Sequence, residues 1–203
     1  MKLPFFTTFV LFTIWTTYQL HKHSHDEDDV IEEFVEKERR ANATRKKSLD
    51  QLPYVTIPLD SLPLHNEISD ERITEYIDIL KDLSNKKIVN LTGQSNTELK
   101  LAYGAPNITK LTEYDSNYTR LVRTLARLGD KYMEYKLFDD ARLLFEYAIS
   151  IGSDVRSCYE KLADLYSKNG EYDKIEQLKA SANQLDSLSK APILRYLDSV
   201  SIF

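Results

Sequence analysis

Residue types on which many active sites depend are scarce in this sequence of 203 residues. A single cysteine, Cys158, excludes a disulfide within the chain, and its place in a predicted helix favours a small core residue. Five glycines leave little material for a glycine-rich phosphate-binding loop. Of four histidines, His65 stands alone, whereas His21, His23 and His25 could ligate a divalent metal. That cluster has no fixed scaffold, and we predict no metal site.

Catalytic motifs and an excess of basic residues are also missing. We find no nucleophile elbow and no helix with paired metal ligands. The pair Asp139–Asp140 falls at an expected turn between helices, where capping and solvation explain it better than acid–base chemistry. The net charge of −5 argues against a nucleic-acid partner. We therefore predict a protein that is not an enzyme and uses no cofactor, small-molecule substrate or nucleic acid.

The strongest pattern present is a near-repetition of the chain at an offset of 34 residues between Val122 and Ser187. Similar residues occupy equivalent positions, namely Leu125 and Tyr159, Leu128 and Leu162, Gly129 and Ala163, Tyr132 and Tyr166, Phe138 and Tyr172, Asp139 and Asp173, Ala148 and Ala182, and Ser153 and Ser187. Each copy contains apolar stripes at helical spacing. The small residues Gly129 and Ala163 would let neighbouring helices approach closely. The pattern predicts two successive helical hairpins.

This stretch resembles a pair of tetratricopeptide repeats, whose period is 34 residues. The first copy matches the family pattern at Leu128, Gly129, Tyr132, Ala141, Phe145 and Ala148. The second copy departs from it at Ile175 and Lys179. The resemblance implies an all-α, α-solenoid domain at residues 116–203, with repeats at 122–155 and 156–189 and a capping helix that follows. It also implies binding of other proteins rather than catalysis.

In the family, the first helix of each repeat lines a concave groove that contacts peptide ligands. Carried over by position, the resemblance assigns partner binding to Arg123, Asp130, Glu134, Glu160, Asp164 and Lys168. Ala126, Met133, Ser157 and Ser167 lie on the same face. Because four of these positions are carboxylates, we expect a protein or peptide partner that is basic. The alternative is ordinary solvation of an exposed helix face.

The N-terminal residues 3–20 carry no charge and are rich in phenylalanine. Their length is at the short end of the roughly 17–25 residues that span a bilayer. Residues 18–22 are all large and form no small-x-small cleavage site, so we predict an uncleaved transmembrane anchor at 1–20, with a cleaved signal peptide as the alternative. Lys2 before the span favours an N-terminus in the cytoplasm and repeats outside it.

Between the anchor and the repeats we expect three further parts. Residues 21–50 form a charged stalk or linker, acidic first and then basic. Residues 51–115 begin with a strip that three prolines keep extended, and continue as N-terminal capping helices. One of these helices is predicted to be capped by Ser69, and another by a capping box of Ser95 and Glu98. The first repeat helix is predicted to begin near Ser116 or Asn117.

These features together predict a single-pass membrane protein that presents its repeats as a docking or scaffold module. The alternative is a fixed structural or accessory subunit of a membrane complex, whose groove is filled by the chain's own proline-rich strip. An enzyme would need a site assembled from residues that no spacing connects.

Overall fold

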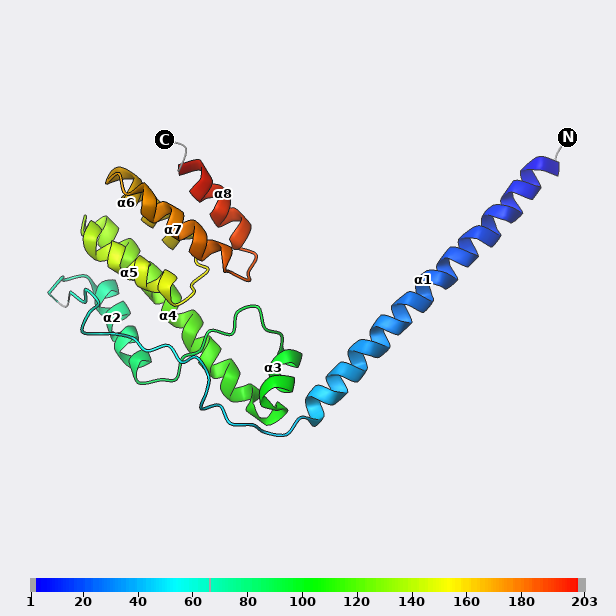
Figure 1. The fold of residues 1–203 in the computed structure, drawn as a ribbon, viewed down its shortest axis with the longest axis horizontal. Helices are drawn as coiled ribbons and strands as arrows, with labels where there is room; N and C mark the ends of the chain where they lie inside the picture. Colours follow the sequence, from blue (N-terminus) through cyan, green and yellow to red (C-terminus); the bar gives the residue numbers. More distant parts are fainter. Residues whose placement is uncertain (1–2, 66, 201–203) are drawn as a thin grey trace. The chain divides into compact units, whose positions relative to one another are not determined.

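The structure is a computed structural model that describes residues 3–65 and 67–200, except for the side chains of residues 3–5 and 20–29. Its helices are α1 (Leu3–Ala43), α2 (Glu71–Ser84), α3 (Asn96–Tyr103), the 3-10 turn η1 (Ala105–Asn107), α4 (Ile108–Glu134), α5 (Phe138–Ser150), α6 (Arg156–Lys168), α7 (Tyr172–Asn183) and α8 (Lys190–Val200) (Figure 1). Within the described residues, extended pairing is limited to an isolated bridge between Tyr54 and Val89. The all-α class predicted from the sequence is confirmed for this part of the chain.

The chain folds as two compact units. The first unit combines Met1–Lys47 with Ser95–Ile108, and the second combines Ser48–Gln94 with Thr109–Phe203. The first unit therefore contains α1, α3 and η1, and the second contains α2, α5 to α8 and all of α4 after its first residue. Residues 95–108, which the sequence placed within the segment 51–115, group with α1 instead.

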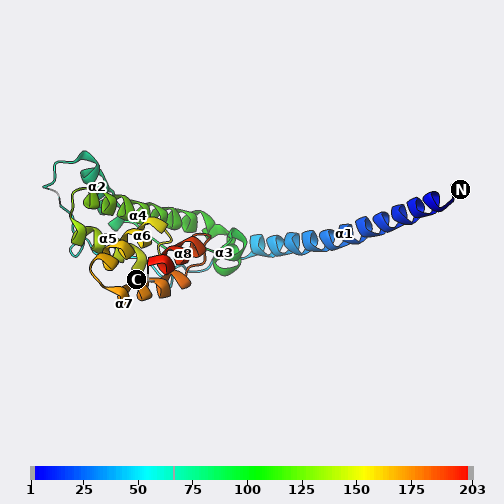
Figure 2. The same cartoon turned by 90° about the horizontal axis from the view of Figure 1, so that it is seen from above.

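In the first unit, α1 is one continuous helix of 41 residues, and α3 packs beside its C-terminal end (Figures 1 and 2). Ala41 is fully buried there, and Lys100 Nζ lies 2.9 Å from Glu38 Oε2. The capping box predicted for α3 is confirmed. Ser95 Oγ accepts from the backbone N–H of Glu98, and Glu98 Oε2 accepts from the backbone N–H of Ser95 at 2.8 Å.

The predicted membrane anchor is wrong. α1 includes residues 3–20, yet no helix in the described part of the chain is both long and apolar enough to cross a membrane. The physical reason is composition, because five threonines and Gln19 interrupt the phenylalanines of this segment. The hydroxyls of Thr13 and Thr16 donate to carbonyls of the helix itself at 2.7 and 2.9 Å. The single-pass topology and the extracytoplasmic placement of the repeats depended on this anchor and are corrected with it.

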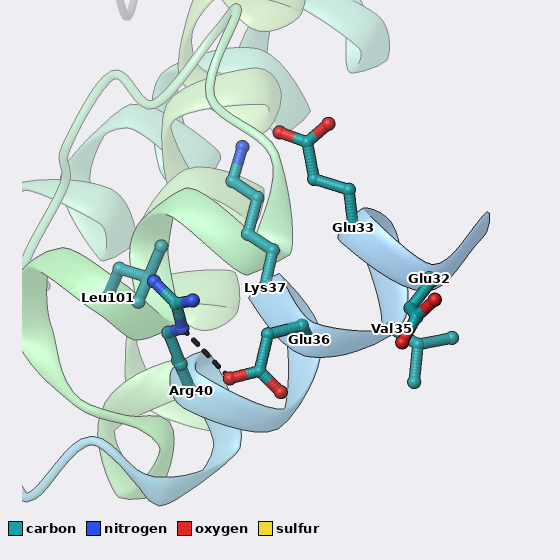
Figure 3. A pocket seen from close by; sticks show the side chains of 7 residues that line it. All are labelled: Glu32, Glu33, Val35, Glu36, Lys37, Arg40 and Leu101. Atoms are coloured by element: carbon teal, nitrogen blue, oxygen red, sulfur yellow. Dashed lines mark hydrogen bonds and ion pairs between the residues drawn. The ribbon is translucent and has the colours of Figure 1, made fainter. Parts of the chain in front are cut away.

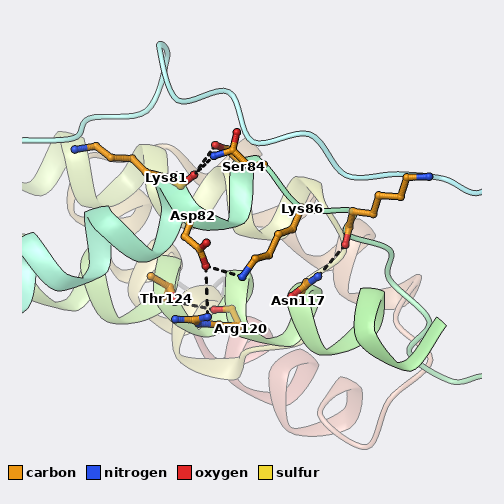
Figure 4. Close-up of polar contacts among 9 residues, drawn as sticks. Lys81, Asp82, Ser84, Lys86, Asn117, Arg120 and Thr124 are labelled. Carbon is orange, nitrogen blue, oxygen red and sulfur yellow. Dashed lines mark hydrogen bonds and ion pairs between the residues drawn. The ribbon is translucent and has the colours of Figure 1, made fainter. Parts of the chain in front are cut away.

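In the second unit, α2 runs antiparallel to α4. Asp82 near the end of α2 lies 3.7 Å from Arg120, in the first half of α4, and accepts a hydrogen bond from Lys86 Nζ at 2.7 Å (Figure 4). At the other end, Asp70 lies 3.9 Å from Lys131 Nζ in the last turn of α4. The apolar face of α2 is buried in the core through Ile73, Ile77, Leu80 and Leu83.

Two helical hairpins follow, α4 with α5 and α6 with α7, and α8 packs against both α6 and α7. Fully buried side chains from all five of these helices form one core, among them Leu128, Phe145, Leu162, Ile175 and Ile193. Gly129 faces the ring of Phe145 so closely that an added Cβ would lie 2.7 Å from Cζ. The predicted close approach at Gly129 is therefore real, and the side chain that approaches it is the aromatic ring of Phe145.

Two predicted helix starts need correction. α4 begins at Ile108, well before Ser116, because η1 leads directly into it. α2 is capped by Asp70 rather than Ser69: the Asp70 carboxylate accepts from the N–H groups of Arg72 and Ile73 at 2.8 and 3.3 Å. A carboxylate at this position also suits the positive end of the helix dipole.

Candidate partner-binding surfaces

The four carboxylates predicted to attract a basic partner are all engaged within the second unit. Asp130 of α4 forms an ion pair with Lys161 of α6. Asp164 of α6 accepts a hydrogen bond from the hydroxyl of Tyr196 on α8 at 2.7 Å. These two contacts tie successive helices together across the row α4, α6, α8.

The remaining two carboxylates have partners on their own helices. Lys131 Nζ donates to Glu134 Oε2 at 2.6 Å, and Arg156 Nε donates to Glu160 Oε1 at 2.5 Å. A lysine or arginine thus neutralises three of the four carboxylates, and the fourth, Asp164, accepts a hydrogen bond from a hydroxyl. The acidic field from which we predicted a basic partner is correspondingly weak on this face.

The other predicted positions divide between surface and core. Arg123 and Lys168 are exposed, and neither forms an ion pair with any residue that the structure describes. Ala126 is only 5% exposed and Met133 packs against the core, so these two positions support the fold. Of the predicted groove positions, Arg123 and Lys168 are therefore the charged side chains that remain available to a partner.

The proline-rich strip lies against the hairpin of α4 and α5, and its backbone is held by tyrosines. The hydroxyl of Tyr132 donates to the carbonyl of Pro63 at 2.7 Å, and that of Tyr147 donates to the carbonyl of Thr56 at 3.0 Å. Ile57 and Leu62 of the strip are buried in the same core as the repeats. Burial raises the pKa of Tyr147 to about 12, which keeps its hydroxyl protonated as a donor.

His65 holds the end of this strip in place through hydrogen bonds to three residues. Its Nε2 lies 2.8 Å from Asp140 Oδ2, its Nδ1 lies 3.3 Å from Glu67 Oε1, and its backbone N–H donates to the Tyr132 hydroxyl at 3.2 Å. The hydrogen bond to Asp140 is the main cause that raises the pKa of His65 above its usual value. Sequence reasoning missed this cluster, because 75 residues separate His65 from Asp140 and no motif connects them.

Cys158 is a buried core residue, as predicted. Its side chain is fully inaccessible, and burial raises the pKa of its thiol to about 12. A thiol with so little thiolate at neutral pH is a poor nucleophile and a poor metal ligand.

The first unit has a hollow of about 730 Å³ between α1 and α3, lined by Glu32, Glu33, Val35, Glu36, Lys37, Arg40 and Leu101 (Figure 3). Arg39 and Arg40 donate to the Glu36 carboxylate at 2.8 and 3.1 Å, and these hydrogen bonds lower the pKa of Glu36 to about 2. Acidic and basic side chains here neutralise one another, so the hollow offers no concentrated charge to a ligand.

Among the described side chains, no group of three or more histidine, cysteine, aspartate or glutamate residues is placed to hold a metal. The side chains of His21, His23 and His25 lie outside the described residues. Comparison with known proteins gives no match to a family model, to a curated protein or to a solved structure.

Proposed function

We propose that the second unit is a protein-interaction module, built as a short helical repeat of the kind that tetratricopeptide proteins use, and that it is not an enzyme. The observation that carries the proposal is that the 34-residue repetition recurs in three dimensions. Leu128 and Leu162 are both fully buried, and Tyr132 and Tyr166 are 0% and 4% exposed.

The turns inside the two hairpins also repeat, atom for atom. The N–H of Leu137 donates to the carbonyl of Tyr132 at 2.9 Å, and 34 residues later the N–H of Glu171 donates to that of Tyr166 at 2.8 Å. The residue before each donor has a positive φ, 61° at Lys136 and 74° at Gly170. Both hairpins therefore close by the same helix-ending turn.

A repeated hairpin places equivalent surface residues in a row, which is how short solenoids build contact surfaces. Phe138 and Tyr172, the first residues of α5 and α7, are 47% and 41% exposed. Tyr135, at the first of these turns, is 47% exposed. Large aromatic side chains are enriched where proteins bind one another, so we assign this row, the turn-edge aromatics, to partner contact.

In the test, the full chain serves as bait, and a protein isolated with it is purified. Direct binding between the two pure proteins is then measured. Phe138→Asp combined with Tyr172→Asp should weaken binding of that partner about tenfold or more, since buried aromatic anchors dominate interface energy. Leu143→Asp is the matched control, because Leu143 is 41% exposed on α5 but does not belong to the row. Equal binding by the double variant and the control would refute this assignment. If no co-isolated protein binds the pure chain directly, the interaction role itself is refuted.

A second candidate is a fixed structural subunit whose groove is filled by the proline-rich strip. The tyrosine hydrogen bonds to Thr56 and Pro63 and the buried Ile57 favour it. Tyr147→Phe separates the two candidates. If the strip competes with a partner, loosening it raises partner affinity, whereas in a fixed subunit the same change lowers stability without raising affinity.

A further inference from the structure

A second hollow, of about 350 Å³, lies where α5 and α7 end, at the opposite ends of these helices from the turn-edge aromatics. Its walls come from four places: the loop at Asn90 and Thr92, the end of α5 at Ser150, Tyr159 of α6, and the end of α7 with the segment that follows it, which holds Asp186 and Ser187. We refer to it as the α5–α7 hollow. Hydroxyl and amide groups dominate these walls, so the hollow suits a polar ligand.

The electrostatics of the α5–α7 hollow favour a positive charge. The helix dipoles of α5 and α7 have their negative ends here, although most of the last carbonyls of both helices accept hydrogen bonds from nearby groups. Asp186 adds a full negative charge, and neither lysine nor arginine lines the hollow. Lys190 Nζ donates to the carbonyl of Asn183 at 2.6 Å and offsets part of the negative end of α7, so the Asp186 carboxylate is the main negative group of the hollow.

The walls are held in place by contacts across the unit. Asn90 Nδ2 donates to the Tyr118 hydroxyl at 3.0 Å, and Asn90 Oδ1 accepts from the N–H of Thr92 at 3.0 Å. The Asp186 carboxylate lies directly over Gly93, where a Cβ would come within 3.0 Å of its Cγ. Gly93 also has a positive φ of 85°, so only glycine lets the loop approach this closely without strain.

One polar atom of the wall lacks a partner. Ser187 Oγ is buried and makes no hydrogen bond within the described residues. A buried hydroxyl that is left unsatisfied costs free energy, so a group that can bond with it is favoured in the hollow. A hydroxyl accepts readily from an ammonium group.

We propose that the α5–α7 hollow receives the side-chain ammonium of a lysine that a partner protein presents. An ammonium has three donors that rotate freely, which suits hydroxyl and carboxylate acceptors that come from different segments. The planar fork of arginine fits paired carboxylate oxygens better than such a scattered set. The inference rests on the proposed interaction role and names the chemistry of the partner.

The test is an NMR titration of the full chain with Nα-acetyl-lysine methylamide. Backbone signals of residues 90–93, 150–152 and 184–187 should shift, and the shifts should shrink as salt is added. The analogue acetylated at Nε keeps the shape of lysine but loses its charge, and it should produce no such shifts. Equal shifts from both compounds, a larger response to the arginine analogue, or shifts at other residues would overturn the proposal.

Two variants localise the effect. Asp186→Asn should weaken binding about tenfold, the loss expected for one charge-assisted hydrogen bond. Thr92→Lys should abolish it, because Thr92 is exposed at the rim and the new ammonium can occupy the hollow. Asp173→Asn, an exposed carboxylate in the first turn of α7, is the matched control and should bind normally. Unchanged binding by Asp186→Asn would overturn the assignment.

The two proposals fail separately. If the chain does not bind lysine, partner binding through the turn-edge aromatics is still tested separately by the variants at Phe138 and Tyr172. Conversely, a chain that binds lysine here but captures no partner would refute the interaction role and leave the α5–α7 hollow as a cation site.

Discussion

Replacing Gly129 by alanine should destabilise the second unit, although alanine is normally the better helix residue. In an open helix position the change would stabilise by about 0.8–1 kcal/mol. Here the new methyl group would lie 2.7 Å from Phe145 Cζ and 3.0 Å from Cδ1, inside contact distance for carbon atoms. Phe145 is fully buried, so its ring can move away only by displacing side chains of the core. Overpacking of this kind costs about 1–3 kcal/mol and should outweigh the helix gain.

The measurement is thermal unfolding followed by helical circular dichroism. For a domain of this size, each kcal/mol lowers the melting temperature by roughly 2–4 °C. The matched control combines Gly129→Ala with Phe145→Leu, which removes ring atoms from the contact. A double-mutant cycle should then show favourable coupling between the two changes. If Gly129→Ala alone raises the melting temperature, the close packing of α4 on α5 described here is refuted.

Three further predictions concern single side chains of the second unit. Lys136→Gly should stabilise the protein by about 1 kcal/mol in chemical denaturation, because glycine relieves the left-handed backbone at φ 61°; a loss of stability would contradict this. Since the pKa of His65 is raised by Asp140, its ion pair stabilises fully below about pH 6.5 and is lost as pH rises through the folded pKa. NMR titration should place the His65 transition above pH 6.5, and Asp140→Asn should lower it; no change in that variant would refute the pairing. Tyr147→Phe should cost about 0.5–1.5 kcal/mol and speed hydrogen exchange near Thr56, whereas equal exchange in both proteins would contradict the contact.

Features encoded within a few residues could be predicted from the sequence. The Ser95–Glu98 capping box depends on short-range chemistry, and the structure has it. The equivalence of Leu128 and Leu162 as buried positions could also be predicted, because a buried stripe must repeat at helical spacing. These signals were sufficient to predict a helical class and the approximate positions of the hairpins.

The candidate sites depend instead on which distant residues meet. Asp130 is partly exposed on α4, but nothing in the sequence indicates that Lys161 on the next hairpin would neutralise it. The same holds for Asp164 and Tyr196, which are 32 residues apart. A charge on a helix surface predicts attraction only when its neighbours are known, because an opposite charge within a few ångströms removes most of its field. The anchor prediction was wrong for a different reason: residues 3–20 carry no charge, but their five threonines and Gln19 make the segment too polar to cross a membrane.

The way the hairpins are covered explains how so short a repeat is completed. Each hairpin must bury its apolar faces against a neighbour, and two alone would leave surfaces open at both ends of the stack. At one end α8 packs on α6 and α7 and buries Ile193 and Leu197. At the other, α2 and the proline-rich strip place Ile77 and Leu62 in the same core. Because the strip supplies core side chains, its removal should unfold the hairpins rather than open a groove. A partner is therefore more accessible at the turn edge and the α5–α7 hollow, where the exposed side chains are not part of the core.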